Sequence, residues 1–162
     1  MSKNINNMEQ KTKINAEDGR QDYVITREFD LPVELLFRAH MEADIVSQWM
    51  GTKVLKLESK KFGSYQFETA DPQGNVAFRA SGVIHELIPN QKIIRTFEMD
   101  NTPFGVQLEV YEFEKLTGDT SRLNMHVIYE SVAQRDQVLK LPFAQGLNWA
   151  HNRLQDIAGK LK

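Results

Sequence analysis

The sequence predicts one α+β domain, in which an antiparallel sheet of about six to seven strands accompanies a long C-terminal helix. Strand-like composition begins near Tyr23 and returns in several runs after Gly51, with two short helical segments between these points. Residues 132–161 carry a helical apolar stripe. A chain of 162 residues, 41% hydrophobic and 26% charged, is long enough for one domain with a core, and no repeat or internal linker divides it.

The amino-acid composition excludes several classes of function. There is no cysteine, so disulfides, thiolate metal sites and cysteine nucleophiles are excluded. A net charge of -2 provides no basic field for nucleic acid. No apolar run approaches the roughly 20 residues of a membrane-spanning helix, and the N-terminus lacks the apolar core of a signal peptide. We therefore expect a cytoplasmic location, no nucleic-acid partner and no membrane span.

The N-terminal residues 1–21 are predicted to be a disordered leader, and residues 22–162 the folded domain. Asn, Lys, Glu and Gln dominate the first twenty positions, and the apolar residues among them, such as Ile14, are isolated. Order is expected from Tyr23, where the run YVITREF has the composition of a strand.

The order of the remaining elements follows from turn and periodicity signals. A first helix is expected after Pro32, and a second short helix ends at Gly51. Strand-like runs follow over residues 54–58, 64–69, 76–88, 91–99, 106–115 and 122–130. The segment Asp71–Asn75 (DPQGN) is a strong turn, because proline fixes φ and glycine accepts a positive φ.

The C-terminal segment has the pattern of an amphipathic helix. Its apolar stripe consists of Leu139, Phe143, Leu147, Ala150, Leu154, Ile157 and Leu161. Pro142 would break a helix that continued through it, because proline removes a hydrogen bond and clashes with the preceding turn. We therefore expect the long helix to begin with Pro142 in its first turn, after a separate short helix or irregular turn over residues 132–141.

A resemblance to a known family is carried by residues 26–51, TREFDLPVELLFRAHMEADIVSQWMG. The pattern R-x-F-x-A-P-x-x-x-V-F-x-A followed by W-W-G is matched at Arg27, Phe29, Pro32, Phe37, Ala39, Trp49 and Gly51. Leu31 replaces the small residue and Met50 the second tryptophan. Further similarity lies in Ser81, Gly82, Val83, Glu86 and Pro89, and in the helical Gly146, Asn148, Arg153 and Leu154. Asn152 stands where the helical motif usually has aspartate. This pattern resembles the activator-of-heat-shock-protein-90-ATPase-like family of the START-like (SRPBCC) superfamily.

The resemblance covers roughly residues 23–161 and implies a helix-grip (START-like) fold. In that fold a curved sheet wraps around the long C-terminal helix and leaves a cavity between them. Members of the superfamily include lipid carriers, hormone receptors, polyketide-processing enzymes and co-chaperone domains. In the named co-chaperone this domain acts beside an N-terminal domain, and here a short polar segment stands in that place.

Strand alternation places an arginine on the inner face of the predicted sheet. Along residues 91–99 the face that contains Arg95 is the more apolar, so Arg95 is expected to point inward. A buried guanidinium needs a carboxylate, an acidic ligand or water, and Glu109 on the next strand is the candidate partner. A register shifted by one residue would instead leave Arg95 in solvent. If Arg95 is an anchor, an anionic ligand could compete for it, and the cavity would prefer acids to neutral esters.

The candidate cavity residues are the side chains predicted to face inward from the sheet and the helices. They are Trp49, Tyr65, Phe67, Arg95, Phe97, Glu109, Tyr111, Met125, Phe143, Leu147, His151 and Leu154. Aromatic and methionine residues at such positions are more often plain core than ligand contacts, and in a cavity fold the same residues can serve both roles.

The four histidines give no sign of a metal site. His40, His85, His126 and His151 have no metal-ligand spacing, and the favoured interpretation for all of them is a solvated or edge-satisfied side chain. Only His151 borders the apolar stripe closely enough to line a pocket. No nucleophile–base set and no phosphate or dinucleotide loop is present, so neither catalytic residues nor a cofactor are predicted.

Three functions remain open. The leading one is binding of an apolar or amphipathic small molecule in an internal cavity. The first alternative is a co-chaperone-like domain that stimulates a heat-shock-protein-90 ATPase, with a chaperone as partner. The second is a cofactor-free polyketide cyclase- or dehydratase-like enzyme, with Arg95, Glu109, Tyr111 or His151 at the pocket. The missing catalytic motifs disfavour hydrolase and kinase chemistry but not acid–base or lyase activity that needs one Tyr, His or Glu. A closed apolar cavity would favour carriage of a ligand, and an open cleft with converging polar groups would favour catalysis.

Overall fold

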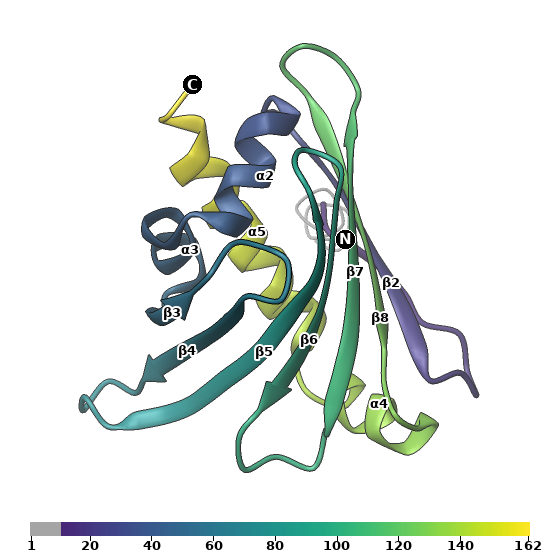
Figure 1. Cartoon of the computed structure of the whole chain (residues 1–162). Helices are drawn as coiled ribbons and strands as arrows, with labels where there is room; N and C mark the ends of the chain where they lie inside the picture. The colour runs from purple at the N-terminus through teal and green to yellow at the C-terminus, as the bar shows by residue number, and fades with distance from the viewer. Residues whose placement is uncertain (1–10) are drawn as a thin grey trace, which may run out of the picture.

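The computed structural model describes residues 11–162, which form a curved antiparallel sheet and four helices (Figure 1). The strands are β1 (Lys13–Asn15), β2 (Asp22–Phe29), β3 (Lys53–Leu57), β4 (Ser64–Ala70), β5 (Val76–Ile88), β6 (Lys92–Met99), β7 (Val106–Lys115) and β8 (Ser121–Ile128). The helices are α2 (Val33–Met41), α3 (Ala43–Met50), α4 (Val132–Leu139) and α5 (Phe143–Gly159). Within the described part of the chain, every helix is too short or too polar to cross a membrane.

The eight strands form one sheet in the order β1-β2-β8-β7-β6-β5-β4-β3. Each neighbouring pair is antiparallel, and the chain meanders from β3 to β8 before closing against β2. Figure 1 shows the sheet curving around α5, with α2 and α3 beside that helix. The predicted α+β helix-grip architecture is therefore confirmed, with more strands than the six to seven expected.

The additional strand lies in the predicted leader, and the prediction of disorder is wrong for residues 11–21. Strand β1 pairs with β2, and Ile14 lies opposite Ile25. Thr12 is buried, and its N–H donates to Oδ1 of Asn148 in α5 at 3.0 Å. Three residues with one apolar side chain are too few to show alternation, so the order of this strand comes from its tertiary partners. The rest of the predicted leader, residues 1–10, lies outside the described residues.

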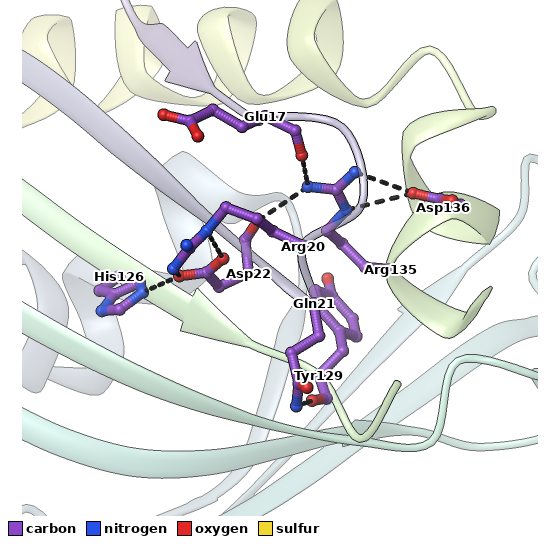
Figure 2. A network of polar contacts seen from close by, with 8 residues as sticks. All are labelled: Glu17, Arg20, Gln21, Asp22, His126, Tyr129, Arg135 and Asp136. Atoms are coloured by element: carbon purple, nitrogen blue, oxygen red, sulfur yellow. Dashed lines mark hydrogen bonds and ion pairs between the residues drawn. The ribbon is translucent and has the colours of Figure 1, made fainter. Parts of the chain in front are cut away.

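A polar network holds the turn between β1 and β2 against α4 (Figure 2). Arg135 donates through Nη1 to the carbonyl oxygens of Glu17, at 2.7 Å, and Asp22, at 3.0 Å. The Asp22 carboxylate pairs with Arg20 at 2.8 Å and with His126 at 2.7 Å. Hydrogen bonds from Arg20 and His126 keep the pKa of Asp22 well below its usual range. His126 projects from the outer face, as predicted.

The two short helices after β2 begin and end where the sequence indicates. Pro32 precedes α2 with φ at -56°, and its carbonyl oxygen accepts from the N–H of Leu36 at 3.0 Å. Glu42, in an extended conformation, separates α2 from α3. Gly51 ends α3 with φ at 62°, the left-handed conformation that glycine adopts most easily.

Pro142 separates the two C-terminal helices, as expected. Helix α4 begins after Ser131, whose Oγ accepts from the N–H of Gln134 at 3.2 Å, and Pro142 immediately precedes α5. Leu154 is fully buried on α5, whereas Leu161 lies beyond the helix and is half exposed. The apolar stripe therefore identified the buried face of α5. Its last member, Leu161, lies two residues beyond Gly159, where the helix ends.

Candidate functional site

A pocket of about 310 Å³ lies between the concave face of the sheet and α5. Side chains from the sheet and from all four helices line it, and most of them are aromatic or aliphatic. Of the predicted residues, those in the lining are Trp49, Phe67, Arg95, Phe97, Glu109, Tyr111, Met125, Phe143, Leu147 and His151. The volume lies at the lower end of the roughly 300–1,000 Å³ of small-molecule sites.

Two predicted residues lie outside the lining. Leu154 is fully buried and belongs to the packed core under α5. Tyr65 is also buried, and its hydroxyl donates to the carbonyl oxygen of Thr96 at 2.5 Å. The Tyr65 ring lies under the guanidinium of Arg95, with 4.6 Å from Cζ to the ring centroid. Tyr65 therefore packs against a lining residue without lining the pocket. Strand alternation shows only which face a side chain is on, so it cannot distinguish these two positions.

Arg95 points inward and pairs with Glu109. The register places the two residues opposite each other on β6 and β7, and Arg95 Nε donates to Glu109 Oε1 at 2.8 Å. Its Nη2 donates to the hydroxyl of Tyr111 at 2.7 Å, and its Cζ lies 5.0 Å from that ring centroid. Both charged side chains are less than one-tenth exposed. The predicted orientation and partner of Arg95 are confirmed, and the alternative register is wrong.

The Glu109 carboxylate is surrounded by donors. Besides Arg95, the hydroxyl of Tyr111 donates to Oε1 at 3.0 Å, and Nε2 of Gln107 donates to Oε2 at 2.7 Å. Burial alone would lower the pKa of Arg95, but its interactions with Tyr111, Tyr65 and Glu109 outweigh burial and raise it. The guanidinium therefore stays charged, and the pair contributes one positive and one negative charge to the pocket wall.

One edge of the guanidinium remains available to the pocket. Contacts among residues 11–162 use Nε and Nη2 of Arg95 and leave Nη1 without a protein acceptor. Within residues 11–162, Arg27 Nε is the only side-chain nitrogen or oxygen that is both inaccessible to solvent and without a hydrogen-bond partner. Because Nη1 of Arg95 also lacks a partner, it must retain some accessible surface. Nη1 is therefore a hydrogen-bond donor without a protein acceptor, on a side chain that lines the pocket.

His40 lines the pocket as well, and the prediction of a solvated or edge-satisfied side chain is wrong for it. Only 7% of its surface is exposed, and the rings of Trp49, Tyr111 and Phe113 pack around it with centroids 5.4–5.6 Å away. Burial lowers the pKa of His40 to about 4, so the imidazole is neutral at pH 7. The sequence did carry a signal, because His40 lies four residues after Leu36 on the apolar face of α2.

His151 occupies the lining as expected, with 2% of its surface exposed. Its Nδ1 lies 2.9 Å from Oγ1 of Thr12, which also accepts from Nη1 of Arg27 at 3.2 Å. The hydroxyl of Thr12 therefore links this pocket histidine to the guanidinium of Arg27 on β2. Burial, assisted by His40 and Arg27, lowers the pKa of His151 to about 3.

The rest of the lining was not anticipated as such. Tyr23 and Tyr129 contribute two hydroxyls 2.7 Å apart, and Leu141, half exposed, lies at the edge of the pocket. His85 is exposed, in agreement with the solvated interpretation, and Trp149, which lies off the apolar stripe of α5, is 61% exposed. Within residues 11–162 no three metal-ligating side chains gather into a cluster.

The comparisons with solved structures agree on the fold. A protein of Rhodobacter sphaeroides superposes with a TM-score of 0.82 at 19% identity, covering 92% of this chain and 99% of that one. A protein of Mycobacterium smegmatis gives 0.80 at 18% identity, with 90% and 95% covered. A protein of Nitrosomonas europaea gives 0.76 at 20% identity, with 91% and 100% covered. At such identities the likeness establishes the fold alone.

The family assignment comes from the sequence itself. No curated protein matches the chain. Residues 30–159 match the family described as Activator of Hsp90 ATPase homolog 1-like protein, which spans the two short helices, the meander and the long helix that enclose the pocket. The chain therefore belongs to the Activator of Hsp90 ATPase homolog 1-like family.

Proposed function

We propose that this protein binds a small molecule with an apolar body and a polar oxygen in the pocket between the sheet and α5. The observation that carries the proposal is the buried guanidinium of Arg95, whose Nη1 has no protein acceptor and which lies in the wall of a mostly aromatic and aliphatic cavity. An apolar ligand gains roughly 25 cal/mol for each Å² removed from water. A single well-placed donor then fixes its orientation. The family's fold is consistent with a ligand-binding domain.

Glu109 removes the preference for acidic ligands that Arg95 alone would give the pocket. From the sequence, a free guanidinium would favour acids over esters. In the pocket the charge of Arg95 is already balanced by a carboxylate 2.8 Å away. A ligand carboxylate at Nη1 would be attracted by Arg95 and repelled by Glu109, so little would offset the cost of its desolvation. The proposed ligand is therefore a neutral amphiphile whose oxygen accepts from Nη1.

The test uses the neutral fluorescent probe N-phenyl-1-naphthylamine, whose emission rises in an apolar site. Ala150 lines the pocket, and Ala150→Phe would place a phenyl ring in the cavity. Ala144 is exposed on the same helix, so Ala144→Phe makes the same substitution outside the pocket. We expect the unaltered protein and Ala144→Phe to bind the probe equally, and Ala150→Phe to bind it at least about tenfold more weakly. Equal binding by both variants, with cooperative unfolding retained, would refute the proposal.

The family description favours a second candidate, action on a heat-shock-protein-90 ATPase. It is tested by measuring that ATPase with and without this protein. Stimulation that Ala150→Phe retains would indicate a surface function independent of the pocket. Unchanged ATPase activity over a wide range of protein concentration would exclude this candidate.

A further inference from the structure

We infer that the pocket recognises a hydroxyl group of its ligand, a phenol or an alcohol, through Nε2 of His40. This inference rests on the proposed function, because it names the chemical group that the same pocket selects. It adds a second point of contact to Arg95 and narrows the ligand from a neutral amphiphile to a neutral hydroxyl compound.

The protonation of His40 is fixed by its own helix. Nδ1 lies 2.9 Å from the carbonyl oxygen of Leu36, and a carbonyl oxygen only accepts, so Nδ1 carries the proton. Nε2 is then a lone-pair acceptor at the opposite edge of the ring, away from α2. The low pKa of His40 keeps Nε2 unprotonated at neutral pH.

This acceptor has no partner in the protein. Among residues 11–162 no donor reaches Nε2 of His40, and Nε2 is not occluded. The groups packed around the imidazole are the aromatic rings of Trp49, Tyr111 and Phe113, and the indole N–H of Trp49 is used by the carbonyl oxygen of Ala39 at 2.7 Å. A ligand donor would give this acceptor the hydrogen bond that the protein does not supply.

The surroundings favour a hydroxyl over other donors. An ammonium group would be repelled by Arg95 and attracted by Glu109, so little would offset the cost of its desolvation. Arg95, whose Nη1 is a donor without a protein acceptor, lines the same pocket, and so does His151, whose ring packs against Trp49 as that of His40 does. A hydroxyl donates its proton to the acceptor and offers its oxygen to a donor, whereas an ether or ester cannot donate.

The experiment compares 2-naphthol with 2-methoxynaphthalene by isothermal titration calorimetry. The ether is the more apolar of the two, so a cavity without a hydroxyl site would bind it more tightly. We expect 2-naphthol to bind at least about fivefold more tightly, as one net hydrogen bond provides. Naphthalene itself is the size control, and it should bind no better than the ether if the added methyl group fits.

The variant His40→Phe keeps the ring and removes the acceptor. Leu36 remains bonded within α2, so no backbone group is left unpaired. We expect His40→Phe to bind both naphthalenes with affinities within about twofold. His85→Phe, the same substitution on the outer face, should keep the preference for 2-naphthol.

Each outcome decides a different point. Equal affinity of the two naphthalenes for the unaltered protein, or a preference that His40→Phe retains, would overturn the hydroxyl site and leave the proposed function standing. The same holds if neither naphthalene binds while N-phenyl-1-naphthylamine does. If that probe also fails to bind, the proposed function falls, and this inference falls with it.

Discussion

At the scale of single residues, Arg95 and Glu109 act as one unit and cannot be interpreted separately. Each is buried, and each satisfies the other at 2.8 Å. Removing the arginine alone would strand a buried carboxylate, which typically costs 3–5 kcal/mol. A loss of ligand binding in such a variant would therefore report on folding as much as on recognition. Glu109 is the better position for a test of specificity, because glutamine keeps its shape and its acceptor oxygen.

We predict that Glu109→Gln changes the preference of the pocket toward acids. The amide oxygen can still accept from Arg95 Nε, but the negative charge that balances the guanidinium is gone. The affinity of 2-naphthoic acid relative to its methyl ester should rise about tenfold, or about 1.4 kcal/mol. Competition against N-phenyl-1-naphthylamine measures both affinities.

The matched control is Glu112→Gln, on the exposed side of the same strand. It removes the same charge without altering the pocket and should leave the ratio of acid to ester unchanged. If both variants behave alike, the effect of Glu109 is one of net charge alone, and its role in selecting neutral ligands is refuted.

At the scale of elements, strand β2 and helix α5 are joined by a second buried guanidinium. Arg27 is 3% exposed, its Nη1 donates to Oδ1 of Asn152 at 2.8 Å, and its Nε has no partner in the described residues. Burial lowers the pKa of Arg27, and the charge of Asp156 offsets only part of this effect. Asn152 occupies the position where the helical motif of the family usually has aspartate.

We predict that Asn152→Asp stabilises the protein. The new carboxylate would meet Arg27 at hydrogen-bonding distance and convert a hydrogen bond to a neutral amide into an ion pair. The free energy of unfolding in urea at neutral pH should rise by about 1–2 kcal/mol. The double variant Arg27→Leu, Asn152→Asp should lose this gain. Lower stability of the single variant would mean that desolvation of the aspartate outweighs its pairing.

The elements also show what the sequence could and could not predict. Pro142, Gly51 and the periodic stripe of α5 act locally, so the helix boundaries near them were predictable. Strand β1 was not, because it is ordered by its pairing with β2 and by the contact of Thr12 with α5, both distant in the chain. Local patterns contain no information on partners so far apart.

The same distinction applies to the candidate site. Alternation on β6 and β7 predicted the Arg95–Glu109 pair, because two adjacent strands define both faces. His40 was missed because a histidine at a helix end has a satisfactory solvated interpretation, although its place on the apolar face of α2 agrees with the packing of three aromatic rings around it. The unused atoms Nη1 and Nε2, on which ligand recognition would depend, can be found only from hydrogen-bond geometry.

At the scale of the whole molecule, the two neutral imidazoles in the pocket make folding depend on pH. In the unfolded chain both titrate near the ordinary pKa of about 6.5. In the folded protein burial lowers these pKa values to about 4 for His40 and about 3 for His151. Above the unfolded pKa both histidines are neutral in both states. As pH falls below it, the unfolded chain takes up protons that the folded protein does not, so stability decreases.

We predict that the free energy of unfolding falls by about 2–3 kcal/mol between about pH 6.5 and about pH 5, a range above the titration of ordinary carboxylates. Each histidine contributes up to about 1.4 kcal/mol per pH unit. His40→Phe should therefore remove about half of the slope, whereas His85→Phe, which alters an exposed histidine, should retain it. Urea unfolding at several pH values in this range measures the slope directly. Because the comparison uses slopes, a uniform change in stability caused by either substitution does not affect it. An unchanged slope in His40→Phe would show that His40 titrates alike in the folded and unfolded states, and that its imidazole is open to water.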